Sequence, residues 1–161
     1  MVLGMSIATF TIAHVVISLV AIAAGAVACA RMLEGRRLDT WNSVFLLFTV
    51  LTTVTGFLFP ITVFTPALGV GIVSAVALAI ALLALYVGRL AGAWRWLYVA
   101  TALFAFYLNV FVLVVQSFQK IGFLNRFAPT GAEPPFAVVQ GIVLLGFILL
   151  GFQLLRRFRP A

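Results

Sequence analysis

Five long apolar runs make up most of this 161-residue chain. They cover approximately residues 7–30, 41–59, 66–88, 96–118 and 135–155. Each run is close to the ~20 residues that an α-helix needs to cross ~30 Å of hydrocarbon. The runs are continuously apolar, whereas a transmembrane β-strand alternates apolar and polar residues over about ten positions. The sequence therefore predicts an all-α integral membrane bundle of five transmembrane helices, forming one domain over residues 1–161.

Composition excludes a water-soluble domain. Hydrophobic residues make up 65% of the chain, charged residues only 8%, and the mean hydropathy is +1.29. A soluble domain is nearer half apolar and a quarter charged. The net charge of +7 is spread over the ends of the apolar runs and forms no nucleic-acid-binding module. We therefore expect membrane lipid, and no nucleic acid, among the partners.

The basic residues alternate between the gaps that separate the runs. Eight of the ten follow the first, third or fifth run: Arg31, Arg36, Arg37, Arg89, Arg95, Arg156, Arg157 and Arg159. Only Lys120 and Arg126 lie between the fourth and fifth runs. Short loops rich in Lys and Arg stay in the cytoplasm. This pattern predicts that the N-terminus lies outside and the C-terminus in the cytoplasm.

Two segments suggest how the helices are arranged. The run at residues 66–88 is rich in small residues, which let transmembrane helices approach closely, so we predict that this helix is the central and most buried one. It follows the second run after a gap of about six residues, which makes these two helices antiparallel neighbours. The longest gap, residues 119–134, has apolar residues spaced among polar ones and predicts a short amphipathic turn at the outer interface.

Polar residues inside the spans are the candidate binding residues. They are His14, Ser18, Thr52, Asn109, Gln116 and Gln140. At 1.5 Å per residue, His14, Thr52, Asn109 and Gln140 lie about 6–14 Å below the outer edge of their helices. Polar side chains in a membrane usually face protein and often mark function. The hypothesis is an outward-facing polar pocket for a small or lipophilic ligand, covered by residues 119–134.

A structural role competes with this hypothesis at every one of these positions. Ser and Thr hydroxyls can bond carbonyls of their own helix, and Asn or Gln can fasten two helices at ~0.6 kcal/mol each. His14 has Ser18 one turn away, so the imidazole is either a satisfied neutral group or one that binds a ligand or titrates. No Asp, Glu, Lys or Arg lies within the core of a run, which argues against an ion-coupled pump or a voltage sensor.

The sequence predicts neither enzyme activity nor a cofactor. A six-coordinate haem in a bundle generally needs two axial ligands, and the chain has a single histidine. Metal catalysis needs three or four ligands. Acyl transfer needs a nucleophile beside a base, and Ser18 near His14 has no carboxylate in reach. A haem or redox protein is therefore the least favoured class, and Cys29 is expected to be an inert thiol.

Two blocks of the sequence resemble a known group of proteins. One is Tyr-Leu-Asn-Val-Phe-Val-Leu-Val-Val-Gln at residues 107–116, with Ala128-Pro129-Thr130 and the segment from Glu133 to Gln140 downstream. The other is Thr-Thr-Val-Thr-Gly-Phe-Leu-Phe-Pro at residues 52–60. Together they resemble an uncharacterised family of small bacterial multi-pass inner-membrane proteins. The resemblance implies a place in the bacterial inner (plasma) membrane, and it supplies no activity or site residues.

These patterns lead to one main hypothesis and one alternative for function. The main hypothesis is a non-enzymatic membrane protein that binds a small lipophilic ligand. Transport of that ligand by a homo-oligomer extends it, because five short helices enclose little space alone. The alternative is a structural or accessory subunit that packs against a partner in a larger membrane complex.

Overall fold

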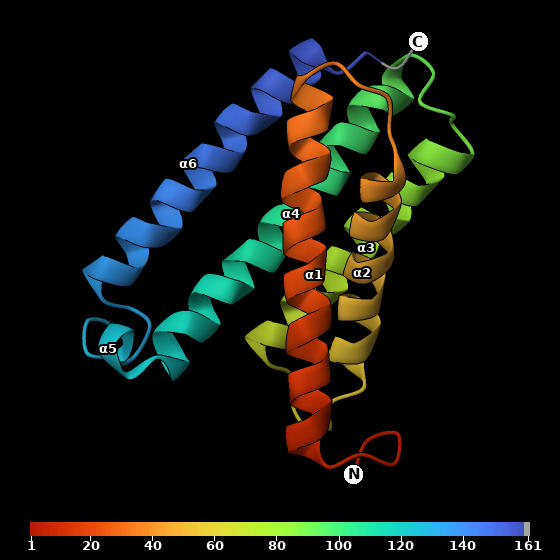
Figure 1. Ribbon diagram of the computed structural model, residues 1–161. Helices are drawn as coiled ribbons and strands as arrows, with labels where there is room; N and C mark the ends of the chain where they lie inside the picture. Colours follow the sequence, from red (N-terminus) through yellow and green to blue (C-terminus); the bar gives the residue numbers. More distant parts are fainter. Residues whose placement is uncertain (160–161) are drawn as a thin grey trace.

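The computed structural model describes residues 1–159 and is helical over most of its length (Figure 1). Five helices in it are long and apolar enough to cross a membrane: α1 (Ile7–Leu33), α2 (Thr40–Phe57), α3 (Pro66–Tyr86), α4 (Ala93–Lys120) and α6 (Pro134–Arg157). A short helix, α5 (Gly122–Asn125), connects α4 to α6. The all-α class and the five candidate spans are confirmed, and each predicted boundary agrees to within three residues.

Local hydrogen bonds explain where the helices begin. The Ser6 hydroxyl accepts from the backbone N–H of Thr9 at the start of α1, and the Thr65 hydroxyl accepts from that of Leu68 at the start of α3. Such caps satisfy N–H groups that have no partner within the helix. Helices α3 and α6 also begin with proline, whose missing N–H is not needed at that position.

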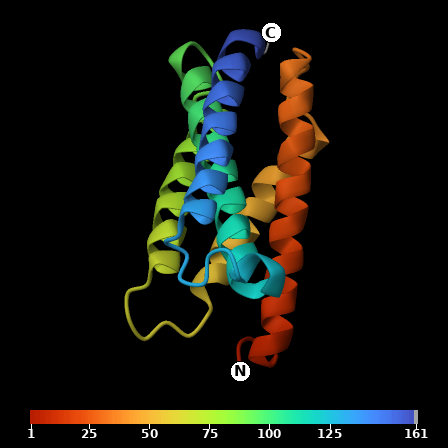
Figure 2. The ribbon, with the colours of Figure 1, turned by 90° about the vertical axis from the view of Figure 1, so that its left-hand side faces the viewer.

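The helices form two neighbouring antiparallel pairs with a fifth helix against the second pair. Helix α1 packs along α2, α3 packs along α4, and α6 leans on α4 (Figures 1 and 2). Helices α2 and α3 are in contact, as their short connection predicts. The N-terminus and the C-terminal end of α6 lie at opposite ends of the bundle, as expected for an odd number of spans (Figure 1).

The prediction that residues 66–88 form the central helix is wrong. Helix α4 contacts α1, α2, α3, α5 and α6, whereas α3 contacts α2 and α4 alone. Small residues of α3 do pack inside the bundle, since Ser74, Ala77, Ala81 and Ala84 are buried, but Ala79 on another face is exposed. Small side chains permit close approach to one neighbour. The number of neighbours depends on the topology.

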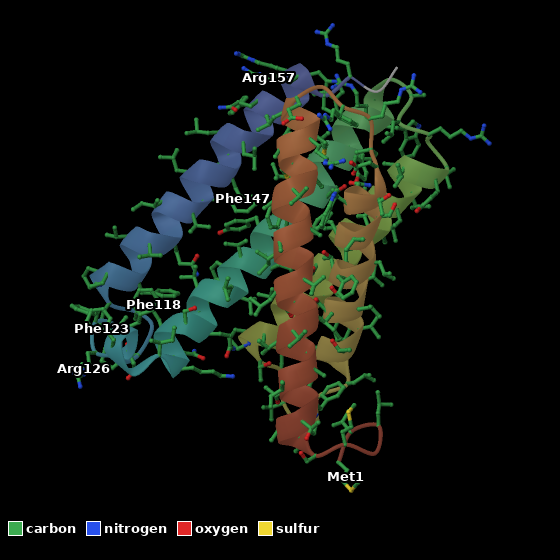
Figure 3. The ribbon with its side chains drawn as sticks, viewed as in Figure 1. Met1, Phe118, Phe123, Arg126, Phe147 and Arg157 are labelled. Carbon is green, nitrogen blue, oxygen red and sulfur yellow. The ribbon has the colours of Figure 1, made fainter. Side chains whose placement is uncertain are left out.

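The basic residues gather mainly at one end of the bundle, which we call the basic end. The C-terminal ends of α1, α3 and α6 and the starts of α2 and α4 lie there, together with the eight arginines named above. Figure 3 shows Arg157 at this end and Arg126 at the opposite end. The tryptophans Trp41, Trp94 and Trp96 also begin helices at the basic end and are exposed. Exposed indole rings are typical of the interface between membrane and water. The side of the membrane on which this end lies remains a prediction.

An ion pair joins the first two helices at the basic end. Asp39 caps α2 by accepting from the backbone N–H of Trp41, and its carboxylate also accepts a hydrogen bond from Arg31. Although desolvation opposes the shift, the hydrogen bond and charge of Arg31 hold the pKa of the Asp39 carboxyl below its ordinary value. The short connection between α1 and α2 is thereby tied to the last turn of α1.

The predicted amphipathic turn is present as α5. Its Phe123 is 68% exposed and makes an edge-to-face contact with Phe127, with ring centroids 5.3 Å apart. Asn125 donates a hydrogen bond from its side chain to the carbonyl of Phe118, which fixes α5 against the end of α4. The segment lies over the ends of α4 and α6, at the end opposite the basic end (Figures 1 and 3).

Candidate functional site

Polar side chains connect neighbouring helices in the half of the bundle away from the basic end. His14 on α1 bonds Thr55 on α2, Asn109 on α4 approaches Thr49 on α2, and Gln140 on α6 donates to a carbonyl of α4. These three contacts link four of the five long helices in succession. The sequence predicts polar groups that face protein on the spans that form α1, α2, α4 and α6, and each of these helices takes part in one of the contacts, with a different partner in each case.

His14 is bound to a hydroxyl of the neighbouring helix. Its Nδ1 lies 2.7 Å from Thr55 Oγ1, and that hydroxyl donates in turn to the carbonyl of Leu51 at 2.7 Å. The tautomer that fits this bond is the one in which Nδ1–H donates to Thr55, and in that neutral tautomer Nε2 is an acceptor. The ring also packs edge-on against Phe59, with centroids 5.3 Å apart. The hydroxyl of Ser18 donates to the backbone carbonyl of His14 and not to the imidazole ring.

The threonines of α2 are satisfied within their own helix. Thr49, Thr52 and Thr53 each donate to the carbonyl four residues earlier, over 2.7–3.0 Å. Such bonds are the structural role that a threonine in a transmembrane helix most often has. Thr49 is fully buried, and its oxygen also faces the Asn109 amide at 3.4 Å, a long contact. Thr52 contacts no other helix through a hydrogen bond in the part of the chain that is described.

Gln116 and Gln140 are the candidate residues that are not fully satisfied. Gln140 is 9% exposed, and its Nε2 donates to the carbonyl of Phe111 at 3.1 Å. The Oε1 atoms of both Gln116 and Gln140 are buried, and neither receives a hydrogen bond from any residue in 1–159. A buried acceptor without a donor costs about 1–3 kcal/mol. These two oxygens are therefore buried acceptors without a donor in the described part of the chain.

The two glutamines lie where α4 and α6 approach the connecting segment. Phe118 on α4 packs edge-on against Phe136 on α6, with ring centroids 5.5 Å apart. Figure 3 places Phe118 between these helices, close to α5. The two rings thus pack between α4 and α6 at this end, while α5 contacts α4 and not α6.

The sequence did not indicate a second polar contact, which lies nearer the basic end. Tyr98 on α4 donates a hydrogen bond to Asn42 on α2, and both side chains are buried. They line a small, partly open cavity of about 20 Å³ together with Cys29, Met32 and Phe106. A cavity of this size holds roughly one water molecule. One feature of the sequence could have indicated this contact: Asn42 and Tyr98 both lie within the first two turns of helices that start at the same end of the bundle.

Comparisons with known protein families, with curated proteins and with solved structures find no match for this chain. Within residues 1–159, no three His, Cys, Asp or Glu side chains come close enough to hold a metal ion. Function must therefore be argued from the helices and from the side chains that connect them.

Proposed function

We propose that the protein is a non-enzymatic multi-pass protein of the bacterial inner membrane, with its N-terminus outside and its C-terminus in the cytoplasm. In this proposal it binds a small or lipophilic ligand in the outer half of the bilayer. Transport of that ligand by a homo-oligomer would extend the function. The topology rests on the eight arginines at the basic end, since positively charged short loops remain in the cytoplasm.

The observation that carries the binding proposal is the pair of buried glutamine oxygens, Gln116 Oε1 and Gln140 Oε1. The hydrocarbon interior holds no water to satisfy them, so a donor must come from another molecule or the cost remains. His14 Nε2 is an acceptor as well, on the α1–α2 side of the same half. The ligand that suits these groups is apolar in its body and carries hydroxyl or N–H donors.

Replacing either glutamine by leucine tests this proposal. We expect Gln116→Leu and Gln140→Leu to lose a small molecule that native mass spectrometry detects on gently purified wild-type protein. Both variants should keep the fold, because leucine preserves volume and removes an unmet acceptor worth about 1–3 kcal/mol. In Gln140→Leu this gain offsets the lost bond to the Phe111 carbonyl, which is worth about 0.6 kcal/mol. Gln153→Leu is the matched control, since Gln153 is on the same helix as Gln140 but is exposed. It should retain the bound mass.

The outcomes of that experiment separate the functional classes. Wild-type protein without any bound small molecule, or leucine variants that keep it, would contradict the binding proposal. Loss of folded protein in the Gln140 variant would show that its amide, which bonds the Phe111 carbonyl of α4, is a fastener between helices. A Soret band in the absorption spectrum of the same sample would identify a haem protein and overturn the assignment as a protein without a cofactor.

The alternative role, an accessory subunit of a larger membrane complex, is favoured by one feature of α6. This helix is the least buried of the five spans, and a Cβ added at Gly141 or Gly146 would meet no atom within 4 Å. Glycine on an open face of a membrane helix serves close packing against another helix. If this alternative holds, the native mass spectrum shows a stable heteromer, and Gly141→Leu disrupts it.

A further inference from the structure

One face of α4 carries polar residues from the middle of the helix to the end opposite the basic end. Asn109, Gln116 and Lys120 follow one another at intervals of seven and four positions. At about 3.6 residues per turn, these intervals place all three on the same side of the helix. The amide of Asn109 faces Thr49 of α2 at 3.4 Å, so this side of α4 points into the bundle.

The chemical character of this face changes in a definite order along the helix axis. Lys120 is the last residue of α4 and is exposed. Gln116 lies one turn deeper, about 6 Å along the axis, and its buried Oε1 has no donor in the described part of the chain. Val112 and Leu113, a further turn deeper, are apolar. A cation, an acceptor and an apolar stretch thus follow one another from the end of the helix inward.

The positive charge of Lys120 has no carboxylate partner within residues 1–159. Two of the three acidic residues of the chain pair with arginines at the basic end. The third, Glu133, accepts hydrogen bonds from Thr130. His14 on α1 is within range of the Lys120 charge, and its neutral imidazole does not compensate that charge. The face therefore combines an unpaired cation with an unpaired acceptor one turn away.

We propose that the ligand bound at Gln116 is an amphiphile with an acidic head and a neighbouring hydroxyl group, an inference that rests on the binding function proposed above. The acidic head, a carboxylate or a phosphate, forms a charge-assisted hydrogen bond with Lys120. The hydroxyl donates to Gln116 Oε1 and so satisfies the buried acceptor. The alkyl chain follows Val112 and Leu113. The order of groups in such a ligand matches their order along α4.

Binding of matched amphiphiles, measured by native mass spectrometry of the protein in detergent micelles, tests this inference. β-Hydroxylauric acid and the diol formed by its reduction differ in the carboxylate. Lauroyl lysophosphatidic acid and monolauroylglycerol differ in the phosphate. We expect one of the two acids to bind about fivefold more tightly than its neutral partner, the effect of one lysine near a membrane surface. The acid that shows this preference identifies the head as a carboxylate or as the phosphate of a lipid.

Substitutions assign the preference to individual side chains. Lys120→Gln should abolish the preference for the acid and keep the binding of its neutral partner. Gln116→Leu should weaken the binding of both. Arg126→Gln is the matched control, because it removes one positive charge from the same end of the bundle, at the end of α5, and it should keep the preference.

The outcomes distinguish this inference from the binding function on which it rests. Equal binding of each acid and its neutral partner, lost in Gln116→Leu, would overturn the acidic head and leave the binding function standing. An equal loss of preference in Lys120→Gln and Arg126→Gln would indicate general surface charge and would also overturn the acidic head alone. Absence of binding by all four amphiphiles, or binding that Gln116→Leu leaves unchanged, would overturn both.

Discussion

Gly25→Leu is expected to prevent the folded bundle from forming. Gly25 is buried on α1, and a Cβ at this position would lie 3.0 Å from Cδ2 of Phe106 on α4 and 3.0 Å from Cδ2 of Phe45 on α2. Those two rings already contact each other, with centroids 5.7 Å apart, so neither can withdraw without disturbing the other. Overpacking of this kind costs about 1–3 kcal/mol for a small addition and more for a large one.

The measurement is the free energy of unfolding of purified protein, titrated from a mild detergent into sodium dodecyl sulfate. Gly25→Ala should lose about 1–3 kcal/mol, and Gly25→Leu should yield little folded protein. Gly141→Leu is the control, because the space beside Gly141 is open and leucine favours the helix more than glycine does. Equal stabilities of the Gly25 and Gly141 leucine variants would refute the close approach of α1 to α2 and α4.

Tyr98→Ala is expected to have the second large effect. Tyr98 is 1% exposed and leads the fully buried side chains in volume. Its loss would enlarge the adjoining cavity of about 20 Å³ and deprive Asn42 of its hydrogen-bond donor. Truncation of a buried aromatic side chain typically costs about 3–5 kcal/mol, because the surrounding structure does not collapse into the space.

Two further variants separate the contributions of packing and hydrogen bonding. Tyr98→Phe keeps the ring and removes the donor, so it should cost only about 0.6–1.7 kcal/mol, the range for hydrogen bonds between membrane helices. Tyr86→Ala should leave the same unfolding titration unchanged within error, since Tyr86 is 68% exposed. A Tyr98→Ala variant as stable as Tyr86→Ala would mean that Tyr98 does not occupy the core between α2 and α4.

The helices and their ends could be predicted because local physics determines them. An apolar run of about 20 residues matches the bilayer, and a charged or proline-containing gap ends it. Thr65 before Pro66 and the two prolines at the start of α6 are helix starts that are visible in the sequence. Consecutive spans must alternate in direction, so every second gap lies at the same end of the bundle. The arginines in those gaps are therefore predicted to gather at one end.

The central helix could not be predicted, because that position depends on contacts among residues far apart in the chain. The aromatic ring of Phe106 contacts Phe45 of α2 and Phe147 of α6, at centroid distances of 5.7 and 5.1 Å. Through these contacts, α4 is the helix that neighbours both α2 and α6. In the sequence, Phe106 is one of 16 phenylalanines and has no local signature.

The hydrogen-bond partners of the polar residues could not be predicted from the sequence either. The rise of 1.5 Å per residue predicts depth, whereas the rotation of each helix decides which side chains meet. His14 therefore pairs with Thr55 on α2, while the hydroxyl of Ser18, one turn away, is taken up by the backbone. The unmet oxygens of Gln116 and Gln140 likewise became apparent only when every donor nearby could be assigned.

The sidedness of the bundle is the central claim, because the proposed position of the ligand site in the outer half of the bilayer depends on it. It can be measured by labelling single cysteines with a membrane-impermeant maleimide on spheroplasts, in a Cys29→Ala background. Ala132 lies between α5 and α6 and Ala91 between α3 and α4, and both are exposed. We predict that Ala132→Cys reacts on intact spheroplasts and that Ala91→Cys reacts only after lysis. The reverse pattern, or reaction of both cysteines on intact spheroplasts, would contradict the topology.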